Sequence, residues 1–129
     1  AFLLEKRADE SLRSELDIGF AQYKVLEAIN QNMLARQNMV AAMLDQTEAS
    51  ISRQIKILQK KGLILVSEVM GNKRAKELSL TVVGDEMVRH AEEILDVTQA
   101  QVIGGLSYQE QRLFQELFER MLTNAKKPQ

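Results

Sequence analysis

The sequence predicts a mainly α-helical protein with one small β-hairpin, and three features support this prediction. Apolar residues recur at helical spacing in six segments. The sole proline is Pro128, so no proline interrupts those segments. Short β-prone runs occur only between Leu63 and Leu80. With 129 residues, 45% of them apolar and 27% charged, the chain is expected to form one domain over residues 1–129.

The six helices are predicted over residues 2–16, 20–30, 36–44, 47–61, 82–103 and 108–125. Residues suited to helix ends support several boundaries. Thr47 can cap one helix and Gly62 can end it in a left-handed conformation, while Ser107 with Glu110 forms a capping box. The runs "LILVSEV" and "KELSL" flank "MGNKRA", which predicts a hairpin with a loose, basic tip.

The order of these elements predicts a winged helix-turn-helix. The helices over 36–44 and 47–61 are separated by the short turn "DQT", and the hairpin that follows forms the wing. The predicted organisation is a winged helix-turn-helix lobe over 20–81, with further helices over 1–18 and 82–126.

Charge is distributed unevenly along the chain. The segment 48–76 contains seven basic and two acidic residues, a net charge of +5, whereas the whole chain has a net charge of -1. The remainder therefore has a net charge of -6. A basic segment on an acidic body suits a surface that faces phosphates, because the patch attracts a polyanion while the rest limits non-specific adhesion.

The predicted helix over 47–61 has an apolar face and an outward face that suits DNA. Placing Ile51, Ile55 and Leu58 inward points Arg53 and Lys56 outward, together with Ala49, Ser50 and Lys60. Early residues of a recognition helix meet base edges in the major groove, and later lysines suit phosphates. The predicted DNA-contacting residues are Thr47, Ala49, Ser50, Ser52, Arg53, Lys56, Lys73, Arg74 and Lys76.

Three motifs resemble the MarR-type (multiple antibiotic resistance regulator) family of winged helix-turn-helix transcription regulators. "FAQYKVLEAI" is similar to its second helix, "SISRQIKILQKKGLI" to its recognition helix, and "NKRAKELSLTVVG" to its wing and the start of its long fifth helix. The resemblance covers residues 20–84. It implies a homodimer built from the terminal helices that binds a pseudo-palindromic operator in double-stranded DNA and usually represses. It also implies a small aromatic acid or phenol as effector, bound between the dimerisation helices and the DNA-binding lobe.

Two features depart from the family pattern. The wing commonly carries Asp-x-Arg, whose arginine enters the minor groove; the matching residues are Asn72 and Arg74, so the acid is missing. Basic residues often found after the Gly-Leu-Ile sequence are replaced by Val66 and Ser67. The missing wing acid slightly favours a second interpretation, a winged-helix protein-interaction and dimerisation module that has lost specific DNA binding. The retained cations in 53–76 argue against that alternative.

The terminal helices carry apolar stripes that predict a dimer interface. Leu4, Ala8 and Leu12 form one stripe, and a broader one near the carboxyl end is too wide for the small core beside it to cover. The predicted interface residues are Leu4, Leu12, Leu113, Phe114, Leu117, Phe118 and Met121.

Other classes of function are disfavoured. The chain has no cysteine, no glycine-rich phosphate loop and a single histidine, so no enzyme mechanism and no cofactor are predicted. His90 shares a helical face with Glu86 and Glu93, but a solvated, salt-bridged face is favoured there over a metal site. The apolar runs are too short to cross a membrane, and the absence of cysteine suits a reducing cytoplasm.

Overall fold

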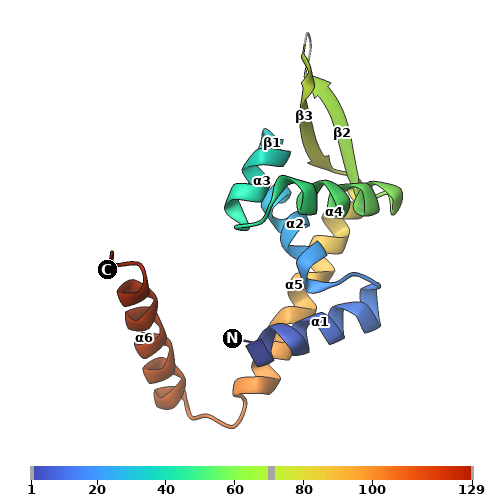
Figure 1. Ribbon diagram of the computed structural model, residues 1–129. Helices are drawn as coiled ribbons and strands as arrows, with labels where there is room; N and C mark the ends of the chain where they lie inside the picture. Colours follow the sequence, from blue (N-terminus) through green and yellow to red (C-terminus); the bar gives the residue numbers. More distant parts are fainter. Residues whose placement is uncertain (1, 70–71, 129) are drawn as a thin grey trace.

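The computed structural model describes residues 2–69 and 72–128, and the side chains of 4–68 and 76–128. Six helices and three strands occur in these residues (Figure 1). The elements in chain order are α1 (Phe2–Leu16), α2 (Phe20–Asn30), β1 (Ala35–Arg36), α3 (Gln37–Met43), α4 (Glu48–Lys60), β2 (Ile64–Val69), β3 (Asn72–Leu80), α5 (Val82–Ile103) and α6 (Tyr108–Ala125).

The predicted helices agree closely with those observed. The helices α1, α2, α5 and α6 have the predicted boundaries. The helices α3 and α4 are each one residue shorter at both ends than predicted, because Arg36, Leu44, Thr47 and Lys61 are their capping residues. A capping residue lies half inside its helix, so pattern alone does not separate it from the first or last helical residue.

The sheet differs from the predicted hairpin in two ways. A third strand, β1, pairs with β3 through Ala35 opposite Leu78 and Arg36 opposite Glu77, giving the antiparallel order β1-β3-β2. In addition, β3 begins at Asn72, four residues earlier than the predicted run "KELSL", because pairing with β2 holds this segment extended. Met70 and Gly71, at the predicted hairpin tip, lie outside the described residues.

The core lies where α2, α4 and α5 meet the base of the sheet. Ile51, Ile55 and Leu58 are buried, so the predicted inward face of α4 is confirmed. These side chains pack in one apolar cluster with residues such as Leu26 and Val88. Burial of this face against α2 and β2 fixes the rotation of α4 about its own axis, and so decides which residues face solvent.

The end of α4 is joined to the start of α5 by a close main-chain contact. Gly62 leaves α4 with a φ of +75°, and the Leu63 N–H donates to the Leu58 carbonyl at 3.0 Å. The Thr81 hydroxyl donates to the Gly62 carbonyl at 2.7 Å and accepts from the Gly84 N–H at 2.9 Å. A Cβ at Gly84 would overlap with the Leu63 carbonyl. Glycine at this position therefore allows α5 to begin directly against the end of α4.

The two terminal helices are packed very differently. Helix α1 lies across α5, where Ala8 and Leu12 are buried within the same chain (Figure 1). The prediction that Leu12 faces a dimer interface is therefore wrong, because its side chain is 0% exposed in the single chain. Helix α6 stands apart from the other helices and has no buried residue.

No helix in residues 2–69 and 72–128 is both long enough and apolar enough to span a membrane.

Replacing Gly84 with alanine is expected to lower the free energy of unfolding by about 3 kcal/mol, because the added methyl group must displace the main chain at Leu63. Urea denaturation at a fixed protein concentration measures this change. Gly105→Ala is the matched control, since its Cβ meets nothing within 4 Å, and its change should stay within about 0.5 kcal/mol. Equal stability of the two variants would contradict the close-contact role of Gly84.

Candidate nucleic-acid interface

The amino end of α4 is fixed by local hydrogen bonds. The Thr47 hydroxyl accepts from the Ser50 N–H at 3.1 Å, which caps the helix. The Ser50 hydroxyl donates to the Gln46 side-chain oxygen at 3.2 Å, and the Gln37 amide of α3 donates to the Glu48 carbonyl at 3.2 Å. The first turn of α4 therefore has a defined position against the turn before it and against α3.

The outward face of α4 carries the residues predicted to contact DNA. Ala49, Arg53 and Lys56 are exposed, as is Lys60 near the end of the helix. Ser50 and Ser52 are half-buried, and Thr47 is exposed at the cap. The structure thus places the predicted residues of α4 at or near the surface, with small polar side chains toward the amino end and cations further along.

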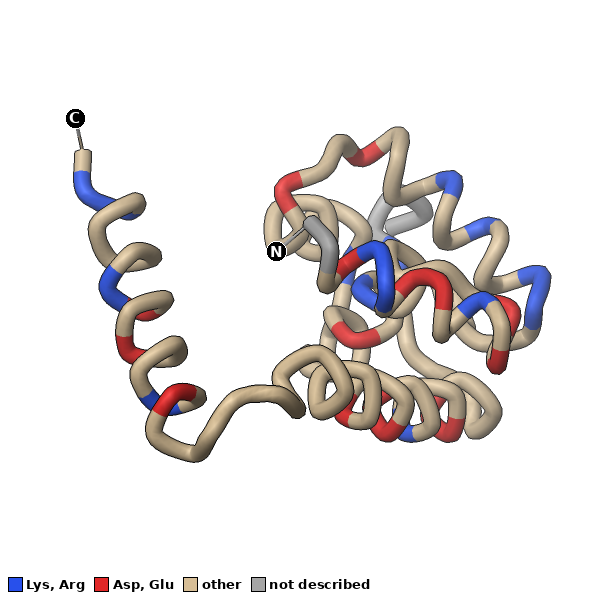
Figure 2. Tube along the Cα trace, turned by 90° about the horizontal axis from the view of Figure 1, so that it is seen from below, with Lys and Arg blue, Asp and Glu red and all other residues tan. Residues whose placement is uncertain are grey.

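The charges of the chain are separated in space as well as in sequence. Figure 2 shows Lys and Arg residues along α4 on one edge of the molecule and Asp and Glu residues along α5 on the opposite edge. Helix α5 contains five acidic residues and one arginine, whereas α4 contains three cations and one glutamate. A polyanion is therefore attracted to the edge with α4 and repelled from the edge with α5.

The cations of this edge are available to an external anion. Among the described side chains, ion pairs join Arg13 to Asp9, Lys61 to Asp17 and Arg89 to Asp85. None of these pairs uses Arg53, Lys56, Lys60 or Lys76. Because their charges are not neutralised by described carboxylates, these side chains can exchange counterions for phosphates.

The wing contributes Lys76 with an exposed side chain. Lys73 and Arg74 lie near the start of β3, and their side chains are outside the described part of the chain. The backbone therefore places these two predicted residues at the far end of the wing from α4.

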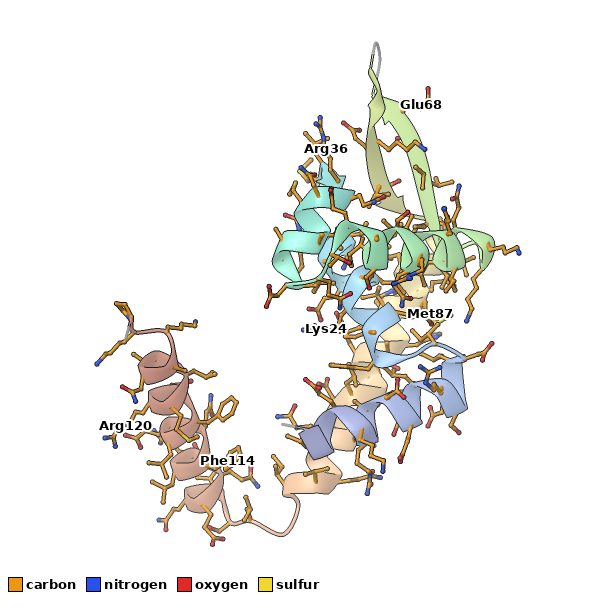
Figure 3. The ribbon with its side chains drawn as sticks, viewed as in Figure 1. Lys24, Arg36, Glu68, Met87, Phe114 and Arg120 are labelled. Carbon is orange, nitrogen blue, oxygen red and sulfur yellow. The ribbon has the colours of Figure 1, made fainter. Side chains whose placement is uncertain are left out.

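Arg36 is a candidate contact that the sequence did not reveal. It is exposed, takes part in none of the described ion pairs and lies beside the wing because β1 pairs with β3 (Figure 3). Arg36 lies between α3 and the wing. In this position it suits contact with a phosphate of the DNA backbone between the major groove and the adjacent minor groove. A lone arginine before a short helix gives no local signal for this position.

One open groove lies on the same lobe, between the end of α2, β3 and the start of α5. It has a volume of about 380 Å³, and residues such as Ile29, Met33, Leu80 and Asp85 line it. The lining side chains include no aromatic ring and no Lys or Arg, so the groove offers no cation for the carboxylate of an aromatic acid and no ring for it to stack on. No cluster of three His, Cys, Asp or Glu residues with metal-site geometry occurs in the described chain, His90 included.

The apolar stripe of α6 is open to solvent. Leu113, Phe114, Leu117, Phe118 and Met121 are all exposed, and the rings of Phe114 and Phe118 stack with centroids 6.1 Å apart. Figure 3 shows Phe114 and Arg120 leaving α6 in different directions, and the face opposite the stripe carries exposed charged residues such as Arg112 and Glu119. Leu4 of α1 is also partly exposed, at 37%. These residues remain available for contact with another chain.

Replacing Thr47 with alanine is expected to lower the free energy of unfolding by about 1 kcal/mol, because the Ser50 N–H loses its acceptor at the start of α4. Thr47→Ser keeps the hydroxyl and should retain most of the stability. The two variants can be compared by urea denaturation, and an equal loss in both would mean that the threonine methyl, not the cap, carries the effect.

The comparisons with known proteins agree with this geometry. No family model matches the sequence. The transcriptional regulator HosA of Escherichia coli is 26% identical over 106 residues, which cover 82% of this chain and 78% of HosA. Wild-type apo MarR from E. coli superposes with a TM-score of 0.84 at 21% identity, covering 94% of this chain and 90% of that one. The S. aureus MepR–DNA complex gives 0.78 at 24% identity, covering 95% and 90%. The resemblance indicated by the sequence motifs is therefore confirmed, and the chain has the fold of the MarR-type winged-helix regulators.

Proposed function

We propose that this chain is a transcription regulator that binds double-stranded DNA through α4 and the wing. The exposed, unpaired cations on the outward face of α4 are the observation on which this proposal rests. A helix of this kind enters the major groove, where its early residues reach base edges and its later cations reach phosphates. The acidic edge along α5 keeps the opposite side of the molecule away from DNA.

The relatives support the same function. HosA is a transcriptional regulator, and MepR and a MarR variant have both been solved in complex with DNA. These relatives are regulators and not enzymes, in agreement with the prediction of a non-enzymatic protein. Repression of transcription through a pseudo-palindromic operator is the finer form of the proposal, and the family resemblance supports it. A small aromatic effector stays a prediction.

The proposed regulator acts as a homodimer assembled through α6. An amphipathic helix with large exposed apolar side chains and no buried residue gains free energy when a second surface covers that stripe. A twofold dimer presents two copies of α4 to two half-sites of DNA, which matches a pseudo-palindromic operator. The partly exposed Leu4 of α1 extends the same proposed interface.

The two DNA-contacting elements are expected to have different roles. Arg53→Ala should cost about 1 to 3 kcal/mol on the selected site and reduce discrimination between that site and a scrambled one, because Arg53 is exposed in the first half of α4. Arg74→Ala should weaken binding to all sequences more evenly. It should also lower the salt slope, the steepness with which log K falls against log salt concentration, by about one unit for each phosphate that the arginine binds. Fluorescence anisotropy on duplexes selected in vitro by the wild-type protein, at several salt concentrations, measures both quantities.

The same titrations test the proposed function itself. A wild-type protein that selects no sequence and shows no salt-dependent binding would favour the protein-interaction module over the regulator. An unchanged selected-to-scrambled ratio in Arg53→Ala, with wild-type binding intact, would show only that α4 does not read bases through this residue.

Replacing Phe114 with glutamate is expected to convert the dimer into a monomer, because a charge then lies in the centre of the apolar stripe of α6. Sedimentation velocity at micromolar protein concentration measures the change in mass. Arg112→Glu is the matched control, since Arg112 lies two residues before Phe114, about 160° around the helix, and should leave the dimer intact. A monomeric wild-type protein under these conditions would rule out the dimer.

A further inference from the structure

The end of α4 is attached to the turn between α1 and α2. The Lys61 ammonium donates to the Asp17 main-chain carbonyl at 2.5 Å, and the Asp17 carboxylate lies 3.8 Å away. These residues are 44 positions apart, so the contact joins two distant segments. Lys61 follows Lys60 directly in the sequence, but the two side chains differ in direction. Lys60 is exposed, whereas only 34% of the Lys61 side chain is exposed and its ammonium points toward the protein.

The turn that Lys61 contacts is itself firmly held. The Asp9 carboxylate of α1 accepts from the Phe20 N–H at 2.8 Å and from the Arg13 guanidinium at 2.9 Å. These two donors keep the pKa of Asp9 below its usual range, the Phe20 N–H having the larger effect. The Asp17 N–H donates to the Arg13 carbonyl at 3.2 Å and Ile18 is buried. Lys61 therefore contacts a fixed corner of the scaffold and not a free loop.

On its other side, the end of α4 is held by α5. The Thr81 hydroxyl donates to the Gly62 carbonyl, and the Thr81 N–H donates to the Leu63 carbonyl at 3.1 Å. The carboxyl end of α4 is thus fixed at two points, one on the α1–α2 turn and one on α5. Helices α1 and α5 pack on each other, so both points belong to the scaffold that carries α4.

Small rotations about this end would have large effects at the other end of the helix. Ser50 lies about 17 Å from Lys61 along α4, at about 1.5 Å per residue. A tilt of roughly 10° at Lys61 would move Ser50 by about 3 Å over that length. Hydrogen bonds to base edges tolerate only a few tenths of an ångström, so base reading depends strongly on this attachment.

We infer that Lys61 is a positioning residue, which orients α4 for base reading by holding its carboxyl end to the α1–α2 turn, and is not a phosphate ligand. This inference rests on the proposed DNA-binding function. Lys60, one residue earlier, belongs to no described ion pair and suits a phosphate. Two adjacent lysines in one basic run therefore have different roles.

The test compares Lys61→Met with Lys60→Met, which remove the same charge at adjacent positions and keep a side chain of similar length. Both variants, checked for folding by circular dichroism, are titrated by fluorescence anisotropy with a duplex selected in vitro by the wild-type protein and with its scrambled counterpart. Lys61→Met should reduce the selected-to-scrambled affinity ratio about three- to tenfold with an unchanged salt slope. Lys60→Met should keep the ratio and lower the salt slope by about one unit.

Two further variants separate positioning from simple loss of charge. Lys61→Arg keeps a donor that reaches the Asp17 carbonyl and should restore the wild-type ratio. Asp17→Asn keeps that carbonyl and should also resemble the wild-type protein, because the carboxylate is only a distant second partner. A lower salt slope in Lys61→Met, an unchanged affinity ratio in it, or failure of Lys61→Arg to restore the ratio would each overturn the inference. A wild-type protein that selects no duplex would instead reject the proposed function.

Discussion

The contact between the end of α4 and the start of α5 constrains the rest of this fold. At Gly84 the α5 backbone approaches the Leu63 carbonyl so closely that no side chain fits, and the Thr81 hydroxyl bridges the Gly62 carbonyl and the Gly84 N–H. The wing begins at Ile64 and ends at Leu80, so β2 starts at this contact and β3 ends at it. The positions of the recognition helix, the wing and the long helix are therefore set together, which suits a surface whose parts must fit one DNA duplex.

Few of the Lys and Arg residues form ion pairs within the described chain, and this leaves positive charge free to attract a polyanion. A chain with a net charge of -1 can still attract a polyanion, because the cations of α4 lie on one edge and the acids of α5 on the other. Lys61 is the exception within the basic run, since its charge is directed to the scaffold. Counting basic residues in the sequence therefore overestimates the number of phosphates that the protein can bind.

Apolar surface provides a second link between fold and proposed assembly. Helix α1 buries most of its stripe on α5 within the same chain, whereas α6 leaves a stripe of six large apolar side chains exposed, from Leu113 to Leu122. The hydrophobic effect favours covering such a stripe, and a second α6 offers the complementary surface. In the proposed dimer, α1 and α5 would then transmit the geometry of the interface to α4 through the two attachments at its carboxyl end.

The sequence alone determined the helices, the inward face of α4 and the winged helix-turn-helix order. These features depend on capping residues, on glycines that end helices and on apolar periodicity, all of which act over a few neighbouring residues. Tertiary structure decided the features that depend on residues far apart in the sequence. Strand β1 has only two residues and exists because β3 supplies its hydrogen bonds, and this pairing also brings Arg36 beside the wing. Leu12 and Leu113 belong to similar stripes, yet α5 covers only the first. Lys60 and Lys61 look alike in sequence, but Asp17 lies within reach of only one of them, because three-dimensional packing sets which distant partner each side chain meets.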